Sequence, residues 1–188
     1  TVVRVPSLKD LGFSGEELLA NGIFLINIQM FGMLLGGLAW GLLGDRHGRV
    51  SVLFGSIILY SIANIANGFV TTIEGYALWR FLAGIGLAGE LGAGITLVSE
   101  MMPKEKRGYG TTIVATVGVM GAVFAAVTSE YMSWRNNYFV GGALGCLLLL
   151  LRVAVSESGL FEKTKSDNVP RGSLLLLFRS RERAFRYL

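Results

Sequence analysis

The sequence predicts an all-α membrane protein, and three observations support this fold class. Of its 188 residues, 52% are hydrophobic and only 16% are charged, whereas a soluble domain carries about 25% charged residues. The mean hydropathy is +0.56. Apolar runs of roughly 18 or more residues recur along the chain, and this is the length that a membrane-spanning helix needs. The 26 glycines fit the frequent glycine of transmembrane helices.

Five membrane spans are expected, each predicted from an apolar run and the signals at its ends. They cover residues 15–43, 49–67, 73–102, 109–131 and 138–155. Ser14 and Glu17 form a capping box that predicts the start of the first helix. Pro103 is expected to end the third span, because proline cannot continue a helix. Residues 156–188 are expected to be a cytoplasmic linker with an amphipathic basic helix at 173–188, which is too short and too charged to span.

Small and polar residues inside the spans predict close packing between helices. Glycines spaced by four residues allow two helices to approach closely, and the first span has the pairs Gly32/Gly36 and Gly37/Gly41. The third span has five glycines within residues 84–94. We expect Asn27 and Gln29 to face other helices rather than lipid, since a polar side chain is costly in hydrocarbon.

The cations are distributed unevenly between alternate loops. The segment 41–49 is expected to be a tight charged loop between the first two spans. Only Arg135 follows the second and fourth spans, while the loops after spans one, three and five carry Arg46, Arg49, Lys104, Lys106, Arg107, Arg152, Lys163 and Lys165. The positive-inside rule then predicts that residues 44–48, 103–108 and those after 155 are cytoplasmic. The N-terminus would lie outside, so we expect a further helix before this segment.

Several function classes lack support in the sequence. An intramembrane hydrolase needs a nucleophile with a base nearby, but no Gly-x-Ser-x-Gly motif occurs and the one histidine, His47, is in a loop. A lone cysteine, Cys146, predicts neither a disulfide nor a metal site. The net charge of +4 comes from cations at the ends of apolar runs, which does not indicate nucleic-acid binding. We therefore expect no enzyme, no metal and no cofactor, and membrane lipid as the surroundings.

Motifs from residue 41 to residue 158 give the sequence a resemblance to a known family of transporters. The first loop has the pattern Gly-x-Leu-x-Asp-Arg-x-Gly-Arg at Gly41, Leu43, Asp45, Arg46, Gly48 and Arg49. Further along, the chain has Arg80, Gly84 and Gly86; then Glu100, Pro103, Arg107 and Gly108; then Trp134 and Arg135; and finally Glu157 and Ser158. In this order they resemble the major facilitator superfamily, and Gly89 with Glu90 looks most like its metabolite:proton symporter branch.

The resemblance implies a fold and a function. The chain would be part of the N-terminal six-helix bundle, covering helices two to six, and its third span would line the central cavity. The complete protein would be a secondary active transporter that moves a small organic solute by alternating access, coupled to a proton. Its missing partners would be the first helix and the C-terminal half. Symport, antiport and uniport stay open, as does a non-transporting sensor or scaffold derived from a transporter.

The charged residues at the expected cytoplasmic ends have two interpretations. They can be a solvated positive-inside loop. They can also be a charge latch that is stable in one conformer and broken in the other, as alternating access requires. The family resemblance implies the second role. The candidate latch residues are Asp45, Arg46, Arg49, Glu100 and Arg107.

Two charges lie within the third span, where they are costly and mark functional sites. Arg80 either snorkels to the outer interface or, as the resemblance implies, packs against the first helix and takes part in proton coupling. Glu90 lies near the middle of the span and shares a face with small residues that leave space for water or solute. It either carries a proton or forms a structural hydrogen bond. Asn27, Gln29, Thr112 and Thr116 can line the path, although interhelical hydrogen bonds are the favoured interpretation for them.

Overall fold

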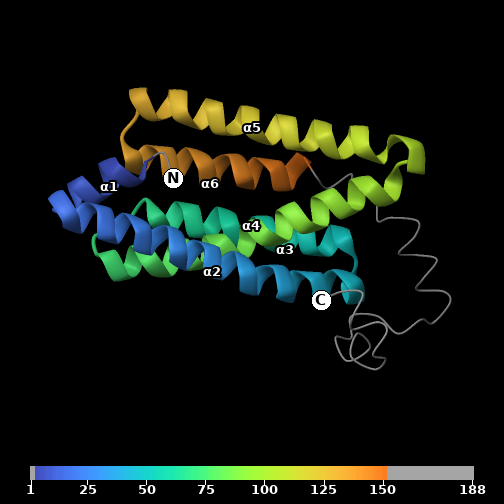
Figure 1. Ribbon diagram of the computed structural model, residues 1–188, viewed down its shortest axis with the longest axis horizontal. Coiled ribbons are helices and arrows are strands. Elements are labelled where there is room, and N and C mark those ends of the chain that lie inside the picture. Colours follow the sequence, from blue (N-terminus) through green and yellow to red (C-terminus); the bar gives the residue numbers. More distant parts are fainter. Residues whose placement is uncertain (1–2, 152–188) are drawn as a thin grey trace.

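The computed structural model describes residues 3–151, which form helices joined by short connections without any strand in that range (Figure 1). The expected linker and basic helix at 156–188, together with Arg152, Glu157 and Ser158, lie outside the described residues. The helices are α1 (Arg4–Asp10), α2 (Gly15–His47), α3 (Arg49–Asn67), α4 (Ile73–Met101), the 3-10 turn η1 (Lys104–Lys106), α5 (Arg107–Tyr131) and α6 (Trp134–Leu151).

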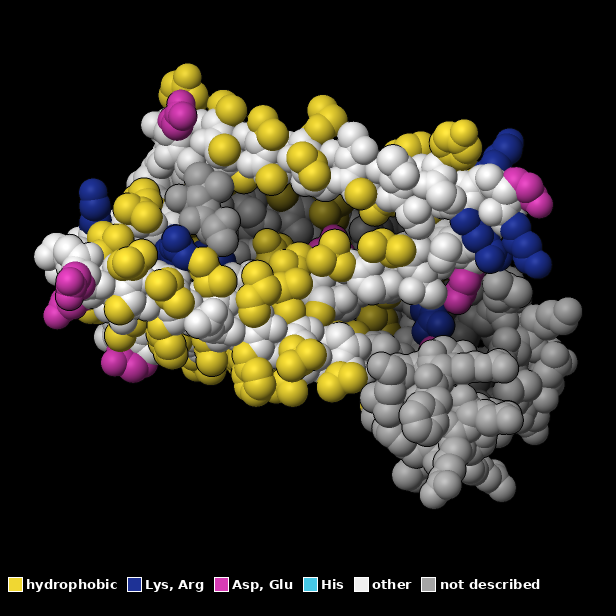
Figure 2. Space-filling view, viewed as in Figure 1, with side chains coloured by type: hydrophobic (Ala, Val, Ile, Leu, Met, Phe, Trp, Pro, Cys, Tyr) yellow, Lys and Arg dark blue, Asp and Glu magenta, His cyan; other side chains and the backbone are white. Residues whose placement is uncertain are grey.

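Four helical segments are long and apolar enough to cross a membrane. They are α2, α3, α4 and the segment 104–131 that contains α5. The fifth expected span, 138–155, continues past the described residues, and its described part belongs to α6. Figure 2 shows hydrophobic side chains along the flanks of the helices, with most acidic and basic side chains gathered at the two ends of the bundle. This distribution is that of a bundle surrounded by lipid.

The helices run back and forth along one axis. The α2–α3 and α4–α5 connections lie at one end of the bundle, while the α3–α4 and α5–α6 connections lie at the other (Figure 1). The most extensive contacts join α4 to α2 and to α3, and α6 packs on α3. By contrast, α5 has only Gly110 buried among its residues.

Helices α2 and α4 approach each other through glycines. A Cβ atom placed at Gly36 would lie 2.6 Å from the carbonyl oxygen of Ile85, which is closer than real Cβ atoms come. Gly32 likewise faces the Phe81 carbonyl, and Gly84 faces the Gln29 carbonyl. The backbones therefore touch directly, as small residues allow in membranes. The pair Gly32/Gly36 packs in this way.

The second expected glycine pair on α2 has a different environment. A Cβ at Gly37 or at Gly41 would have nothing within 4 Å among the described residues. Both glycines instead border a hollow between α2 and α4, so they make no close helix contact within residues 3–151. On the other side of α4, Gly86 meets the backbone of Ser56 and Tyr60 in α3.

Several helix ends differ from the sequence-based expectations. The charged segment 41–49 is largely not a loop, because α2 continues to His47 and a single residue, Gly48, links it to α3. Gly48 has a φ of +100°, which glycine adopts without strain. Arg46 and His47 occupy the last turn of α2, where cations favour the helix C-terminus. The last turn of α2 therefore contains charged residues that the hydropathy pattern assigned to a loop.

The start of α2 also differs in detail. Ser14 is the N-cap residue, as expected, but its side chain makes no cap hydrogen bond, so the predicted capping box is wrong. The next residue, Gly15, has a φ of +56°, a left-handed conformation that glycine adopts without strain. Helix α1 was not expected from the polar N-terminal stretch. As expected, α4 ends just before Pro103, at Met101.

The adjacent residues Gly36 and Gly37 provide a matched test of the glycine contact. We expect Gly36→Ala to lower the free energy of unfolding by about 1–3 kcal/mol, because the new methyl group forces α2 away from α4. Gly37→Ala should leave stability nearly unchanged. Thermal unfolding of the purified protein in detergent measures both. Equal effects of the two variants would contradict the direct backbone contact.

Candidate functional site

Two polar clusters each include a residue of α4, and they lie near the opposite ends of this helix. The Arg49 cluster consists of Asp45, Arg49 and Glu100 at the end of the bundle where α2 meets α3. The Arg80 cluster consists of Arg80, Gln29, Tyr76, Tyr138 and Ser7 near the other end.

The Arg49 guanidinium lies between two carboxylates from different helices. Its Nη1 atom donates a hydrogen bond of 2.7 Å to Oδ1 of Asp45 in the last turn of α2. Its Nε atom is 3.5 Å from Oε1 of Glu100 in the last turn of α4. The side chains of Arg49 and Glu100 are only 20% and 19% exposed, so this ion pair is partly shielded from solvent. The cluster ties together the ends of α2, α3 and α4.

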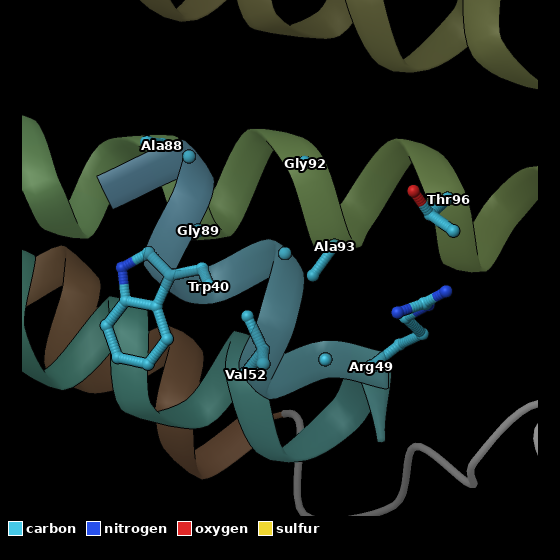
Figure 3. A pocket seen from close by; sticks show the side chains of 11 residues that line it. Trp40, Arg49, Val52, Ala88, Gly89, Gly92, Ala93 and Thr96 are labelled. Atoms are coloured by element: carbon cyan, nitrogen blue, oxygen red, sulfur yellow. The ribbon is translucent and has the colours of Figure 1, made fainter. Parts of the chain in front are cut away.

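Small residues leave room for the Arg49 side chain. A Cβ at Gly44 would lie 3.0 Å from Nη1 of Arg49, so a larger residue there would push the guanidinium aside. In Figure 3, Arg49 extends toward Thr96 on α4, and Trp40 lies at the other end of the same hollow. This hollow has a volume of about 150 Å³ and is lined mainly by small residues of α2 and α4.

The other two candidate latch residues lie outside this cluster. Arg46 is exposed in the last turn of α2. Arg107 opens α5, and its Nε atom donates to the carbonyl oxygen of Met102 at 3.2 Å. Of the five predicted latch residues, the structure therefore brings together Asp45, Arg49 and Glu100.

Arg80 is buried inside the bundle and does not snorkel to the surface. Its relative exposure is 9%. The Nη1 atom donates to Oε1 of Gln29 at 3.3 Å, and Nη2 donates to the Tyr76 hydroxyl at 3.5 Å. The guanidinium carbon lies 4.9 Å from the centre of the Tyr138 ring and 5.4 Å from that of Tyr76. Aromatic faces attract a cation at these distances, so the two tyrosines form a cage around the charge.

A chain of buried hydroxyl groups joins the cage to α1. The hydroxyls of Tyr76 and Tyr138 are 2.7 Å apart, and Ser7 Oγ is 2.9 Å from the Tyr76 hydroxyl. Ser7 in turn donates to the carbonyl oxygen of Arg4 at 2.8 Å. Sequence reasoning missed these three hydroxyl residues. The available signal was that Tyr76 lies one turn before Arg80, a spacing that places both on one face of a helix.

A cavity of about 320 Å³ opens beside Arg80, between α3, α4, α5 and α6. Its lining combines apolar side chains such as Phe124 and Leu144 with polar ones. From α5, Thr128 lines this cavity. The Thr116 hydroxyl donates to the Thr112 carbonyl at 2.9 Å within its own helix, so it forms no interhelical bond.

The two expected polar residues of α2 differ in their surroundings. Gln29 faces α4 and accepts the hydrogen bond from Arg80, which agrees with the expectation that it faces another helix. Asn27 is exposed on α2 among the described residues, so its expected contact with another helix stays a prediction. The two positions are only two residues apart and therefore lie on different sides of the helix.

Glu90 is partly exposed on α4. On the face that it shares with small residues, Gly86 meets the α3 backbone, and Leu97 is buried in a cluster with Val52 and Leu53. These two positions are therefore used for packing of α4 on α3.

A further charged cluster lies at the opposite end of the bundle from Arg49. Arg135 donates to the carbonyl oxygens of Gly68 and Val70 at 3.0 and 2.9 Å, and it is 3.3 Å from Oδ2 of Asp10. Trp134 donates to the same carboxylate at 3.2 Å. These bonds fasten α6 to the α3–α4 connection and to α1.

Charged side chains inside a membrane bundle are rare and mark functional sites. A family model described as Major Facilitator Superfamily matches residues 5–188. The chain belongs to this superfamily.

Similar proteins include several bacterial transporters. The chain is 28% identical to the "Probable 4-methylmuconolactone transporter" of Cupriavidus pinatubonensis, over 77% of this chain and 36% of that protein. It is 30% identical to the "Niacin transporter NiaP" of Acinetobacter baylyi, over 72% of this chain and 32% of that protein. It is 31% identical to the "Benzoate transport protein" of the same organism, over 78% of this chain and 34% of that protein. The chain thus spans only part of these relatives, which are named as transporters and not as enzymes.

The fold is also similar to a solved structure. The partially occluded, inward-open form of the xylose transporter XylE from E. coli superimposes with a TM-score of 0.76 at 16% sequence identity. The match covers 89% of this chain and 48% of XylE. This likeness supports the fold, which is part of a larger helical bundle.

The tyrosine chain can be tested by removing one hydroxyl. We expect Tyr76→Phe to lower the free energy of unfolding by about 1–3 kcal/mol, because it leaves buried polar partners on Ser7 and Tyr138 without their bond. Tyr109→Phe is the control, since Tyr109 is 75% exposed on α5. The measurement is the thermal unfolding midpoint in detergent. Unchanged stability in Tyr76→Phe would show that these hydroxyls do not hold α1 and α6 together.

Proposed function

We propose that the complete protein is a secondary active transporter that moves a small organic solute across a membrane by alternating access, coupled to a proton. The observation that carries this proposal is the Arg49 cluster, in which charged side chains connect the ends of three helices. Charge pairs can break and re-form as helices move, whereas the glycine contacts of α2 with α4 keep their geometry. The names of the relatives, which refer to 4-methylmuconolactone, niacin and benzoate, support a small organic solute.

The proposal includes an orientation. The end of the bundle with the Arg49 cluster also carries Lys104, Lys106 and Arg107, so cations outnumber acids there. The opposite end carries an excess of acids, which are Asp10, Glu16, Glu17, Glu74 and Glu130. The positive-inside rule then supports a cytoplasmic position for the Arg49 cluster and for residues 44–48 and 103–108.

The latch role of the Arg49 cluster predicts a specific loss of transport. We expect Arg49→Gln to reduce initial uptake by about tenfold or more, because it removes the guanidinium that joins the Asp45 carboxylate of α2 to the Glu100 carboxylate of α4. Arg49→Lys should recover part of the rate, since it keeps the charge but loses the planar fork. Uptake into vesicles, normalised to the amount of protein in the membrane, is the measurement.

Lys104→Gln is the matched control for the latch variant. Lys104 is an exposed cation at the same end of the bundle and lies outside the Arg49 cluster. The solutes named for the relatives, niacin and benzoate, are the first to test. If Lys104→Gln reduced uptake as much as Arg49→Gln, the effect would come from general surface charge and the latch would be rejected.

Glu90 is proposed as the proton carrier. It is an acid on α4, in the middle third of a membrane span, where a fixed charge is costly and a group that gains and loses a proton is useful. We expect Glu90→Gln to abolish accumulation driven by an imposed proton gradient while solute exchange without a gradient continues. Full gradient-driven accumulation in Glu90→Gln would remove Glu90 from the coupling step and leave it a structural role.

A further inference from the structure

We propose that Trp40 is a spacer that sets the separation of α2 from α4 and thereby the geometry of the Arg49 cluster. This makes Trp40 a positioning residue for the latch, and the inference rests on the proposed transport function for its uptake experiment only. It is carried by the packing of the Trp40 ring, by the hydrogen bond of its indole, and by a change in the α2–α4 contact at this residue.

The contact between α2 and α4 changes at Trp40. Before Trp40 along α2, Gly36 lies directly against the backbone of Ile85, so the two helices touch. After Trp40, Gly41 of α2 and Gly92 of α4 border the hollow of about 150 Å³. A Cβ atom at either of these two glycines would have nothing within 4 Å among the described residues. Small residues line both parts of the interface, so residue size alone does not explain why the helices touch in one part and separate in the other.

The Trp40 ring lies between the helices at the place where they separate. A Cβ atom at Gly89 of α4 would lie 2.6 Å from Cδ1 of Trp40, so the indole rests on the α4 backbone. A Cβ atom at Gly55 of α3 would lie 3.2 Å from Cη2 of the same ring. The ring also packs against the buried cluster of Val52, Leu53, Ala93 and Leu97. Two glycines thus make room for one large side chain among three helices.

A hydrogen bond fixes the orientation of this ring. The Nε1 atom of Trp40 donates to the carbonyl oxygen of Ile85 in α4 at 2.8 Å. A shielded indole N–H needs such a partner, and the bond holds the ring at one angle between the helices. Because tryptophan is rigid, a ring held in this way maintains a defined distance between α2 and α4.

The separation that Trp40 sets is the one that the Arg49 cluster spans. Trp40 and Arg49 lie at opposite ends of the same hollow (Figure 3). Arg49 bridges Asp45 of α2 at 2.7 Å and Glu100 of α4 at 3.5 Å. If the helices moved together, the guanidinium would lose its room, since a Cβ at Gly44 already comes within 3.0 Å of its Nη1 atom. The bridge therefore depends on the distance between α2 and α4.

The first measurement is the distance between the ends of α2 and α4. Spin labels are attached at His47→Cys and Met101→Cys, two exposed positions that end these helices, in the complete transporter with Cys146→Ser. We expect Trp40→Ala to shorten the label distance by up to about 4 Å, the space that one layer of carbon atoms occupies. Gly89→Ala should lengthen it, because the new methyl group pushes against the indole. Pulsed electron paramagnetic resonance in detergent gives both distances.

Further variants separate the bulk of the ring from its hydrogen bond and supply a control. Trp40→Phe keeps an aromatic ring without the N–H donor, so it should shift the label distance less than Trp40→Ala does, and it serves as the test if Trp40→Ala does not fold. Gly92→Ala is the matched control for Gly89→Ala, because it adds the same methyl group one turn along α4 in open space. Gly92→Ala should leave the distance unchanged.

An uptake experiment separates a positioning role from a general loss of stability. We expect Trp40→Ala to reduce initial uptake by about tenfold, as Arg49→Gln does, when uptake is normalised to the amount of protein in the membrane. Adding Arg49→Gln to Trp40→Ala should cause little further loss, because the cluster is already displaced. Two independent defects would instead multiply.

Two results would overturn the inference. An unchanged label distance in both Trp40→Ala and Gly89→Ala would show that Trp40 does not set the separation of the helices. Multiplied losses of uptake in the double variant would show that Trp40 does not act through Arg49. If Arg49→Gln alone transported normally, the latch of the proposed function would fail, while the label distances would still decide whether Trp40 is a spacer.

Discussion

The structure depends on the close approach of α2 and α4. Their backbones touch where Gly32, Gly36 and Gly84 leave no side chain between them. Within a membrane, helices gain no hydrophobic free energy from associating, so van der Waals contact over a long interface has to hold them together. Trp40 adds one directed bond across this interface, from its indole N–H to the Ile85 carbonyl at 2.8 Å. Glycine at these positions is thus a requirement of the fold.

Both polar clusters follow from this helix pair. Gln29 reaches Arg80 only because the carbonyl of the same residue already lies against Gly84. At the other end, Glu100 of α4 comes within 3.5 Å of Arg49, which also binds the last turn of α2. Larger residues between α2 and α4 would separate the two helices and move apart the interacting groups in each cluster. The glycine spacing therefore positions the charges as well as the backbone.

The sequence predicted the features that hydropathy and helix breakers determine, which are the helices and some of their ends. It did not predict which side chains meet across the bundle. It predicted an all-helical membrane bundle, the contact through Gly32 and Gly36, and the end of α4 before Pro103. It failed at the end of α2, because the charged residues 45–47 resemble a loop, whereas the basic Arg46 and His47 suit the C-terminus of a helix. The positions of Arg80 and Glu100 were evident from the sequence. Their partners depend on helix rotation, and hydropathy periodicity does not determine rotation when a helix is apolar on every side.

The placement of both clusters on α4 has a mechanical consequence for the proposed mechanism. Helix α4 is one continuous element from Ile73 to Met101, with Arg80 near its start and Glu100 in its last turn. The helix therefore connects the Arg80 cluster to Glu100 without a flexible joint between them. A small rotation of α4 would change the distance from Glu100 to Arg49, which is held by α2 and α3. The Arg80 cluster and the Arg49 cluster are thus joined by one continuous helix, so a movement of α4 would change the contacts of both.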